Sequence, residues 1–462
     1  MIRLYDTARG EVRPLQLRHP GRLSMYVCGP TVDNLPHLGH GRFTLVWDVA
    51  RRWFTFQGLS VHYVSNITDI DDKIIARAAA EGRTESDVVK QFEGEWWDAM
   101  ARLGVAEPND IPHATDYVAD MVTLIESLLT SDVAYQTSDG VYFDVARVPD
   151  YGLLAGQPLE SLKAGARVEQ NEEKRSPLDF ALWKNAKPGE PSWPAPFGDG
   201  RPGWHTECVV MSLDLLGEDF DLHTGGLDLK FPHHENERAQ AVADSKAFAR
   251  HWGHNGWVMV DGVKMSTSLN NFTSLTDLLE KTDPRAYRLL VLRSHYRSPI
   301  EVSPATIADA ERALARLDSF ARRFELLALG DKFQVASAHY WEGESLELYE
   351  RVVALMNDDL NTPAAVGELF EAVTAAHQTA DEGQDATAQR LAESINVLFG
   401  AMGLELQAGT KEVDEVSAKL AVERDAARAA ENWSEADRLR DELVERGWIV
   451  EDGSSGTVIR RA

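Results

Sequence analysis

The fold is decided by the stretch LSMYVCGPTVDNLPHLGHGR, which runs from Leu23 to Arg42. Its first six residues, Leu23 to Cys28, are mostly apolar and predict a buried strand. A turn rich in glycine and proline follows, and a helical pattern then extends from about His40 to Phe56. The next apolar run, Val61 to Ser65, predicts a second strand. A strand, a helix and a strand at these spacings form a βαβ unit, so we expect a parallel sheet covered by helices, with ligands beyond the carboxyl ends of its strands.

Further along the chain, changes of pattern indicate several parts. Between about Asp139 and Arg201 the sequence is irregular and rich in Pro, Gly and Trp, which indicates an insertion in the sheet domain. A strand pattern returns near Trp257, and a helical pattern begins at about Ala305. We therefore predict an α/β fold: a Rossmann-like parallel-sheet domain split by an insertion, then a helical bundle, then a small C-terminal α+β region. The predicted boundaries are 1–138 and 202–304 for the two halves of the sheet domain, 139–201 for the insertion, 305–405 for the bundle and 406–462 for the C-terminal region.

Composition limits the class of protein. The 462 residues are 44% hydrophobic and 26% charged, which is typical of a globular chain of several domains. No apolar stretch suggests a secretory signal or a membrane span, and with only two cysteines the sequence favours a cytoplasmic protein without disulfides. The net charge of −27 argues against a generally basic surface, so any nucleic-acid site must be a local concentration of Lys and Arg.

The tetrapeptide His37-Leu38-Gly39-His40 lies between the predicted strand and the predicted helix. Imidazoles at a helix N-terminus can hydrogen-bond a polyphosphate, the helix dipole favours its negative charge, and Gly39 permits a close approach. Taken alone, such a string more often consists of ordinary turn histidines, and its position in the βαβ unit is what favours a function.

A second candidate for phosphate chemistry is the polar loop after the strand near Trp257. Its residues are Lys264, Met265, Ser266, Thr267 and Ser268. A lysine and several hydroxyls on a mobile loop can close over a triphosphate and stabilise the charge that develops as pyrophosphate leaves. The alternative is a solvated loop with a helix-capping serine.

Four residues are of the types that bind transition metals: Cys28, Cys208, His233 and Glu237. A helix begun after Pro232 would place His233 and Glu237 on one face, because they stand at i and i+4. Two thiolates, an imidazole and a carboxylate are a suitable ligand set for Zn²⁺. Two buried structural cysteines beside a solvated acidic helix are the other interpretation.

The run from Asp221 to Asp228, DLHTGGLD, predicts a strand, a glycine turn and a carboxylate. Such a turn lets the backbone meet a ligand while Asp228 accepts hydrogen bonds from a ribose or an amino group. An ordinary turn would have the same sequence.

HLGH and KMSTS, in that order on a split nucleotide-binding fold, resemble the two ATP motifs of class I aminoacyl-tRNA synthetases. The strings YVCGPTVDNLPHLGHGR, NITDIDDKI, GWHTEC, HTGGLDLKFPHHENERAQ and DDLNTP resemble the sequence blocks of the cysteinyl-tRNA synthetase family and extend over most of the chain. The resemblance implies activation of L-cysteine with ATP, and transfer of cysteine from cysteinyl-adenylate to the terminal adenosine of tRNA(Cys). The parts after residue 305 would then bind tRNA, and 406–462 would bind its anticodon.

The same resemblance assigns roles to single residues. Cys28, Cys208, His233 and Glu237 would hold a zinc ion that the substrate thiolate joins directly, so that serine is rejected without an editing domain. The residues around the amino acid or adenylate would be Gly29, Thr68, Trp204 and Asp228. His37, Gly39, His40 and the KMSTS residues would bind ATP with its Mg²⁺, and His37, His40 and Lys264 would be catalytic. Candidate anticodon readers are Arg428, Asp437 and Asp452, and the family favours a monomer.

One position departs from the family pattern: Thr267 stands where the usual KMSKS string has its second lysine. We hypothesise that Thr267 keeps only a hydrogen bond to phosphate while Lys264 supplies the charge. Unchanged activation kinetics in a Thr267→Lys variant would count against a phosphate contact.

Two other functions compete with the synthetase. The related ligase of mycothiol synthesis also forms cysteinyl-adenylate but passes cysteine to an amino sugar, and it is shorter in the C-terminal region. A catalytically silent RNA-binding relic is suggested only by Thr267 and the acidic charge, and the intact HLGH and metal-ligand residues argue against it.

Overall fold

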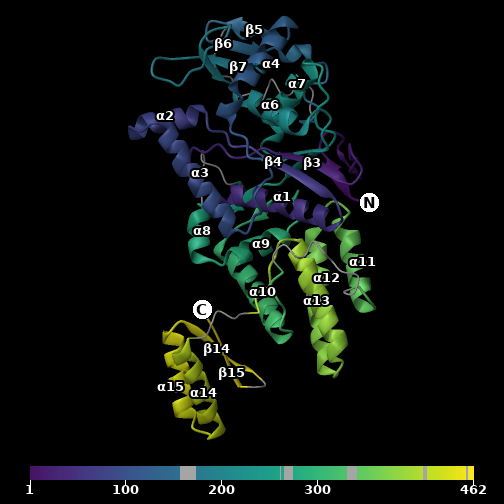
Figure 1. Ribbon diagram of the computed structural model, residues 1–462, viewed down its shortest axis with the longest axis vertical. Coiled ribbons are helices and arrows are strands. Elements are labelled where there is room, and N and C mark those ends of the chain that lie inside the picture. The colour runs from purple at the N-terminus through teal and green to yellow at the C-terminus, as the bar shows by residue number, and fades with distance from the viewer. Residues whose placement is uncertain are drawn as a thin grey trace. The chain divides into compact units, whose positions relative to one another are not determined.

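The computed structural model describes residues 1–156, 173–260, 262–264, 274–329, 341–408, 414–453 and 456–461. It divides into two compact units. The first consists of Met1–Leu314 and Leu329–Glu405, and the second consists of Ala315–Ala328 and Leu406–Ala462. Figure 1 labels most of the helices and several of the strands of the two units.

A four-stranded parallel sheet lies at the centre of the first unit, in the order β10-β9-β3-β4. Its strands are β3 (Arg22–Val27), β4 (Ser60–Ser65), β9 (Leu222–Gly226) and β10 (Trp252–Asn255). The predicted βαβ unit and parallel sheet are therefore confirmed. From β3 the chain proceeds to β4 on one side, and from β9 it proceeds to β10 on the other. The carboxyl ends of β3 and β9 thus form the topological switch point, where open α/β sheets bind ligands.

Helix α1 (Leu38–Phe56) connects β3 to β4. Its buried face carries large side chains, Trp47, Trp53 and Phe54, which are fully buried. The helix begins with a capping box in which the side chains of His37 and His40 accept hydrogen bonds from each other's backbone N–H groups. This box fixes the helix start at the carboxyl edge of the sheet.

The chain between β4 and β9 forms helices and a second, antiparallel sheet. The helices are α2 (Asp72–Glu81), α3 (Glu85–Arg102), α4 (Val118–Thr130) and α6 (Trp204–Leu216), and the sheet has the order β5-β6-β7-β8. Its strands are β5 (Ala134–Thr137), β6 (Gly140–Phe143), β7 (Phe180–Asn185) and β8 (Gly200–Pro202). Much of this sheet lies in the part of the sequence that looked irregular, because prolines and glycines in the connections mask the short strands.

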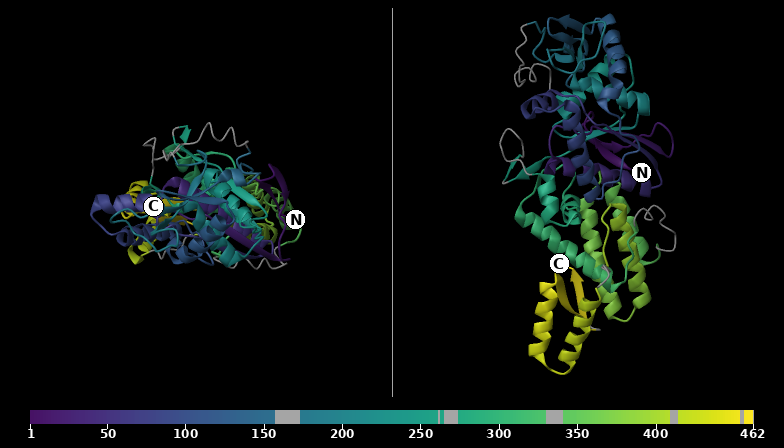
Figure 2. Two further views of the ribbon diagram at one scale, coloured as in Figure 1. Left: turned by 90° about the horizontal axis from the view of Figure 1, so that it is seen from above. Right: turned by 60° about the vertical axis from the view of Figure 1, so that its left-hand side comes forward.

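Figure 2 shows the remaining elements of the first unit from two further sides. They are β1 (Arg3–Asp6), β2 (Glu11–Pro14), the turn Lys230–His234, α7 (Glu235–Ala243), β11 (Val258–Val260), β12 (Val263–Lys264), α8 (Leu275–Lys281), α9 (Pro284–Leu292), β13 (Ile300–Glu301), α11 (Glu344–Met356), α12 (Thr362–Asp381) and α13 (Asp385–Ala401). Helix α10 (Pro304–Arg323) begins in this unit and ends in the second. The prediction that the chain after residue 305 is helical is confirmed. None of the described helices combines the length and the apolar character that crossing a membrane requires.

The second unit is a small α+β body. Helices α14 (Glu415–Ala429) and α15 (Trp433–Glu445) precede the hairpin of β14 (Trp448–Gly453) and β15 (Gly456–Arg461). Leu439, Leu443 and Trp448 form its buried core. The C-terminal region therefore has the α+β character expected from the sequence.

A buried ion pair joins distant parts of the first unit. Nη1 of Arg288, on α9, lies 2.8 Å from Oδ2 of Asp48, on α1, and both side chains are almost completely buried. Nη2 of Arg288 donates to the carbonyl oxygens of Leu103 and Gly104 after α3, at 3.1 and 3.0 Å. A Cβ at Gly403, whose φ is +75°, would lie 2.3 Å from the guanidinium. The site of this ion pair therefore requires a glycine in the turn after α13.

The electrostatics of Asp48 follow from this packing. Burial alone would raise the pKa of its carboxyl group, but Arg288 and Arg52 lower it below the usual value. Removing one cation from a buried pair leaves charge that water cannot screen.

We expect Arg288→Met to destabilise the first unit by about 3 kcal/mol, because Asp48 would lose a buried partner. Urea unfolding followed by tryptophan fluorescence measures the change. Arg293→Met is the matched control: Arg293 pairs with Asp309 at the surface, so its loss should cost less than about 1 kcal/mol. Equal effects of the two substitutions would contradict the assigned role of the Arg288 pair.

Candidate active site and metal centre

Four side chains from separate elements meet beyond the carboxyl end of β3. Cys28 directly follows β3, Cys208 lies on α6, His233 lies on the turn before α7, and Glu237 lies on α7. All four are buried, and their ligand atoms lie within 4.8 Å of one another. The structure thus brings together the residues predicted as a metal-ligand set.

The distances fit a metal of the size of zinc. Sγ of Cys28 lies 3.6 Å from Sγ of Cys208 and 3.4 Å from Oε1 of Glu237. Nε2 of His233 lies 3.6 Å from Sγ of Cys208 and 2.9 Å from Oε1 of Glu237. Four ligands about 2.0 to 2.3 Å from a tetrahedral ion are themselves about 3.3 to 3.8 Å apart. Only the imidazole-to-carboxylate distance is shorter, as expected for two groups that share a proton.

The pKa shifts within this group also fit a set of metal ligands. Burial, together with Cys208 and Glu237, raises the pKa of the Cys28 thiol. Burial also acts to raise the pKa of Cys208, but hydrogen bonds from Cys28 and His233 bring it down to about 6. Although burial disfavours its charged form, His233 has a pKa raised to about 10, chiefly by Glu237. A proton on His233 thus provides positive charge at the place where a metal cation can provide it instead.

Further histidines surround the four candidate ligands. Nε2 of His223 lies 2.7 Å from Oε2 of Glu237, and Nε2 of His234 lies 3.3 Å from Sγ of Cys28. Together with Cys28 and Glu237 they make a second geometrically possible metal set. Neither histidine was predicted from the sequence to belong to the metal site. The sequence shows several histidines, in HTGG and PHHEN, near the candidate ligands. It does not indicate which imidazole faces the thiols.

A contact behind His233 fixes the orientation of its ring. Nδ1 of His205 lies 2.8 Å from Nδ1 of His233. If Nδ1 of His233 carries the proton of this hydrogen bond, Nε2 is left as an electron-pair donor facing Cys208 and Glu237. Such a contact sets the tautomer of a metal-binding histidine.

The residues predicted to surround the amino acid lie beside the same group. A Cβ at Gly29 would lie 1.7 Å from the carbonyl oxygen of Asn66, so only glycine fits there. The hydroxyl of Thr68 donates to Oε2 of Glu207 at 2.8 Å. The ring of Trp204, which is 37% exposed, stacks on His233 with 4.0 Å between ring centroids. Trp204 therefore forms a wall between the buried donors and the solvent.

Glu207 is another residue of the site for which no function was predicted from the sequence. Its side chain is fully buried, and burial is the main cause of its raised pKa. Within the described residues, its Oε1 has no hydrogen-bond partner. Oγ1 of Thr68 donates to Glu207 and accepts a hydrogen bond from Nδ2 of Asn66 at 3.4 Å, so one lone pair of the threonine hydroxyl remains available to a donor.

The HLGH tetrapeptide presents two parallel imidazoles at the start of α1. The rings of His37 and His40 stack with 3.6 Å between centroids and 11° between planes. Nδ1 of His37 accepts from the backbone N–H of His40 at 3.1 Å, and Nδ1 of His40 accepts from that of His37 at 3.3 Å. Since each Nδ1 is an acceptor, the proton of each neutral ring is on Nε2.

Both imidazoles are neutral at physiological pH. Burial lowers the pKa of His37 to about 4 and that of His40 well below its usual value. The pair therefore offers two N–H donors to a ligand and no net charge. The exposed Asp228, in the turn after β9, lies close enough for its charge to act on the pKa of His37.

Comparison with known proteins identifies the family. Residues 14–312 match the model of tRNA synthetases class I (C) catalytic domain, and residues 351–407 match the DALR domain. The chain is 44% identical to the cysteine–tRNA ligase of Laribacter hongkongensis and 43% identical to that of Dechloromonas aromatica, with 100% of each chain covered. The chain belongs to the cysteine–tRNA ligase family. It is thus an enzyme of the class I aminoacyl-tRNA synthetases, as its motifs implied.

Solved structures agree on the fold. Methionyl-tRNA synthetase of Mycobacterium tuberculosis in complex with methionyl-adenylate aligns with a TM-score of 0.61 at 15% identity, covering 83% of this chain and 90% of that one. The leucyl enzyme of Agrobacterium radiobacter aligns with a TM-score of 0.60 at 12% identity, covering 84% of each chain. This member of the cysteine–tRNA ligase family therefore has the class I fold.

The predicted KMSTS loop and the candidate anticodon readers do not belong to this group of side chains. Lys264 ends β12, and Met265, Ser266, Thr267 and Ser268 lie outside the described residues. In the second unit, Arg428 lies on α14, Asp437 is exposed on α15, and Asp452 lies on β14. Their reading of an anticodon stays a prediction.

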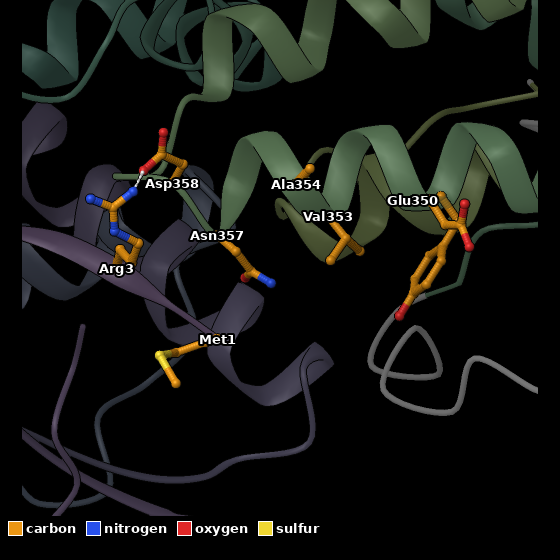
Figure 3. A pocket seen from close by; sticks show the side chains of 8 residues that line it. Met1, Arg3, Glu350, Val353, Ala354, Asn357 and Asp358 are labelled. Carbon is orange, nitrogen blue, oxygen red and sulfur yellow. Dashed lines mark hydrogen bonds and ion pairs between the residues drawn. The ribbon is translucent and has the colours of Figure 1, made fainter. Parts of the chain in front are cut away.

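A shallow pocket of about 370 Å³ lies away from these motifs, between the N-terminus and α11 (Figure 3). Its charged wall is the ion pair of Arg3 and Asp358, 3.0 Å apart. The two charges satisfy each other, and the rest of the lining is mostly apolar or amide. The geometry gives this pocket no part in the chemistry of the family.

We expect the purified protein to contain a stoichiometric divalent transition metal, and Cys208→Ser to lose most of it, because a hydroxyl is a poor substitute for a thiolate ligand. Mass-spectrometric metal analysis after gel filtration measures the content. His62→Gln, which replaces a surface imidazole, is the control and should keep its metal. Full metal occupancy in Cys208→Ser would exclude the thiol as a ligand.

Proposed function

We propose that this protein is a cysteine–tRNA ligase that selects its amino acid through zinc. The carboxylate of L-cysteine attacks the α-phosphorus of ATP, the bond to the β-phosphate breaks, and cysteinyl-adenylate and pyrophosphate form. A ribose hydroxyl of the terminal adenosine of tRNA(Cys) then attacks the activated carbonyl, and AMP leaves. The observation that carries the proposal is the buried group of two thiols, an imidazole and a carboxylate in a chain of this family.

In this proposal Cys28, Cys208, His233 and Glu237 hold the zinc. The metal, when bound, supplies a position that a substrate thiolate can occupy and a serine hydroxyl occupies far less well. The four-residue set is preferred to the one with His223 and His234 because it uses both thiols. Oε1 of Glu237 faces the other ligands while Oε2 accepts from His223, so one carboxylate can serve both contacts.

The amino acid lies between the metal group and the start of α1. Gly29 lets the substrate approach the backbone, because any side chain at this position would overlap Asn66. Thr68, oriented by Glu207 and Asn66, presents one hydroxyl lone pair to the substrate ammonium group. Trp204 excludes water from the metal side, and Asp228 binds the amino group or the ribose of the adenylate.

His37 and His40 bind the phosphates of ATP through their two Nε2–H donors, and Gly39 allows the close approach. Donors already oriented by the capping box need no rearrangement as charge develops on the α-phosphate. Lys264 and the rest of the KMSTS loop, Met265, Ser266, Thr267 and Ser268, complete the ATP site, and Mg²⁺ accompanies the triphosphate.

The proposal extends to partners and location. The helical part and the second unit bind tRNA(Cys), with Arg428, Asp437 and Asp452 as candidate readers of the anticodon. We propose a monomer in the cytoplasm, where both cysteines remain thiols. In the structure, Cys28 and Cys208 are free.

The amino-sugar ligase is the second candidate because it shares the cysteinyl-adenylate chemistry. The DALR match at residues 351–407 and the full-length similarity to cysteine–tRNA ligases support tRNA as the acceptor. The intact HLGH geometry supports an active enzyme rather than a silent relic.

The decisive experiment is ATP-dependent attachment of labelled cysteine to a transcript of tRNA(Cys), with serine as the control amino acid. We expect charging with cysteine alone. Cysteine-dependent pyrophosphate exchange without charging would favour the amino-sugar ligase, and the absence of both reactions would contradict the enzyme proposal.

We expect His40→Ala to lower kcat of cysteine-dependent pyrophosphate exchange by about 10²- to 10³-fold, because one preorganised donor to the transition state is lost. Exchange of labelled pyrophosphate into ATP measures the rate, and metal content should be unchanged. The surface variant His62→Ala should retain the wild-type rate. A similar rate in His40→Ala would remove His40 from the catalytic machinery.

A further inference from the structure

The proposed ATP site has Lys264 and Mg²⁺ as its cations, and the imidazoles at the start of α1 add no positive charge. A triphosphate carries several negative charges, and a buried anion must be paired with cations or hydrogen-bond donors. His37 and His40 are neutral, since burial lowers both pKa values. The sequence also replaces the second lysine of the usual KMSKS string with Thr267. Another cation close to the HLGH pair would meet this need.

Lys73 is placed to be that cation. It lies in the first turn of α2, where its backbone N–H donates to the capping carboxylate of Asp71 at 2.9 Å. One turn later, Nη1 of Arg77 donates to the carbonyl oxygen of Asp33 at 3.0 Å. Positions i and i+4 share a helix face. The face that carries Lys73 therefore adjoins the loop that leads into His37.

Backbone pairing holds the two segments in this arrangement. Thr31 and Thr68 form a parallel bridge, with Val32 N–H donating to the carbonyl oxygen of Thr68 at 3.2 Å. The segment before α2 thus lies along the loop before α1. Burial is the main cause of the lowered pKa values of His37 and His40, and the positive charge of Lys73 lowers both of them further.

The ammonium group of Lys73 is exposed, and within the described part of the chain it forms no ion pair or side-chain hydrogen bond. The neighbouring carboxylates are already engaged. Asp71 caps the helix, and Asp72 pairs with Lys184 at 2.6 Å and with Arg201. A cation in the first turn also opposes the helix dipole. Local stability therefore does not account for a lysine at this position.

We propose that Lys73 binds the phosphates of ATP together with His37 and His40, and that it stabilises the pyrophosphate as it leaves. The inference rests on the proposed ligase function and adds a residue to that site. In this arrangement the two imidazoles donate hydrogen bonds while Lys73 supplies charge from α2.

A purely structural role would direct Lys73 towards Asp33. The charge of Lys73 lowers the pKa of Asp33, although burial raises it overall. No ion pair within 4.0 Å joins these two residues in the described structure. A structural role would affect all ligands of the site alike, whereas a phosphate contact affects only ligands that carry phosphates. This difference determines the test.

The test compares Lys73→Met, Lys73→Arg and wild type in cysteine-dependent pyrophosphate exchange, with adenosine as a competitive inhibitor that lacks phosphates. We expect Lys73→Met to lower kcat/KM for ATP by about tenfold to a hundredfold, while the inhibition constant of adenosine changes by less than about twofold. Lys73→Arg should recover most of the loss because it restores the charge. Lys90→Met, an exposed lysine on α3, is the matched control and should behave as wild type.

Two results would overturn the inference. One is an unchanged kcat/KM for ATP in Lys73→Met, and the other is a parallel weakening of ATP and adenosine. Wild-type exchange serves as the separate check on the ligase function. If wild type shows no cysteine-dependent exchange, the proposed function fails; if wild type is active and Lys73→Met is unaffected, only the role of Lys73 fails.

Discussion

The structure depends on bringing two thiols, an imidazole and a carboxylate together in one buried space. Isolated buried charges are very costly, so thiols and a carboxylate can share such a space only if a cation or a proton balances them. The sheet makes this possible: β3 ends just before Cys28, and the neighbouring β9 leads through the turn Lys230–His234 to His233 and Glu237. Helix α6 adds Cys208 from a third direction. The surrounding small residues and histidines are consequences of this convergence.

Glycine positions illustrate how tightly the site is built. A Cβ at Gly225 would lie 2.9 Å from the ring of His234, and one at Gly29 would lie inside a backbone carbonyl group. These glycines allow the imidazoles and the backbone to approach the metal group closely. In turn, His205 and His223 hold His233 and Glu237 by hydrogen bonds at 2.8 and 2.7 Å. The orientation of the donors is therefore set before any ligand arrives, which lowers the cost of binding.

Much of this arrangement could be predicted from the sequence, and the missing parts have a common reason. The strand at Leu23 to Cys28, helix α1 and the ligand types were accessible because local periodicity and residue chemistry determine them. The strands of the antiparallel sheet were obscured by prolines and glycines in their connections. The ion pair of Arg288 and Asp48 joins residues 240 positions apart, and no local pattern reports such a contact. The roles of His223 and Glu207 depend on the directions of side chains, which the sequence does not contain.

The same physics separates the two halves of the active site. At the proposed metal site, thiolates and a carboxylate would balance the charge of the metal within the protein, so an added fixed cation would weaken metal binding. At the start of α1, the triphosphate of the proposed function would bring the negative charge, and fixed anions would repel it. Neutral imidazoles at His37 and His40 are compatible with both requirements, because they could donate hydrogen bonds to phosphate without adding charge to the metal side. Positive charge for the phosphates is then best supplied from a separate element such as α2, where Lys73 is exposed to solvent and carries its charge without a large desolvation cost.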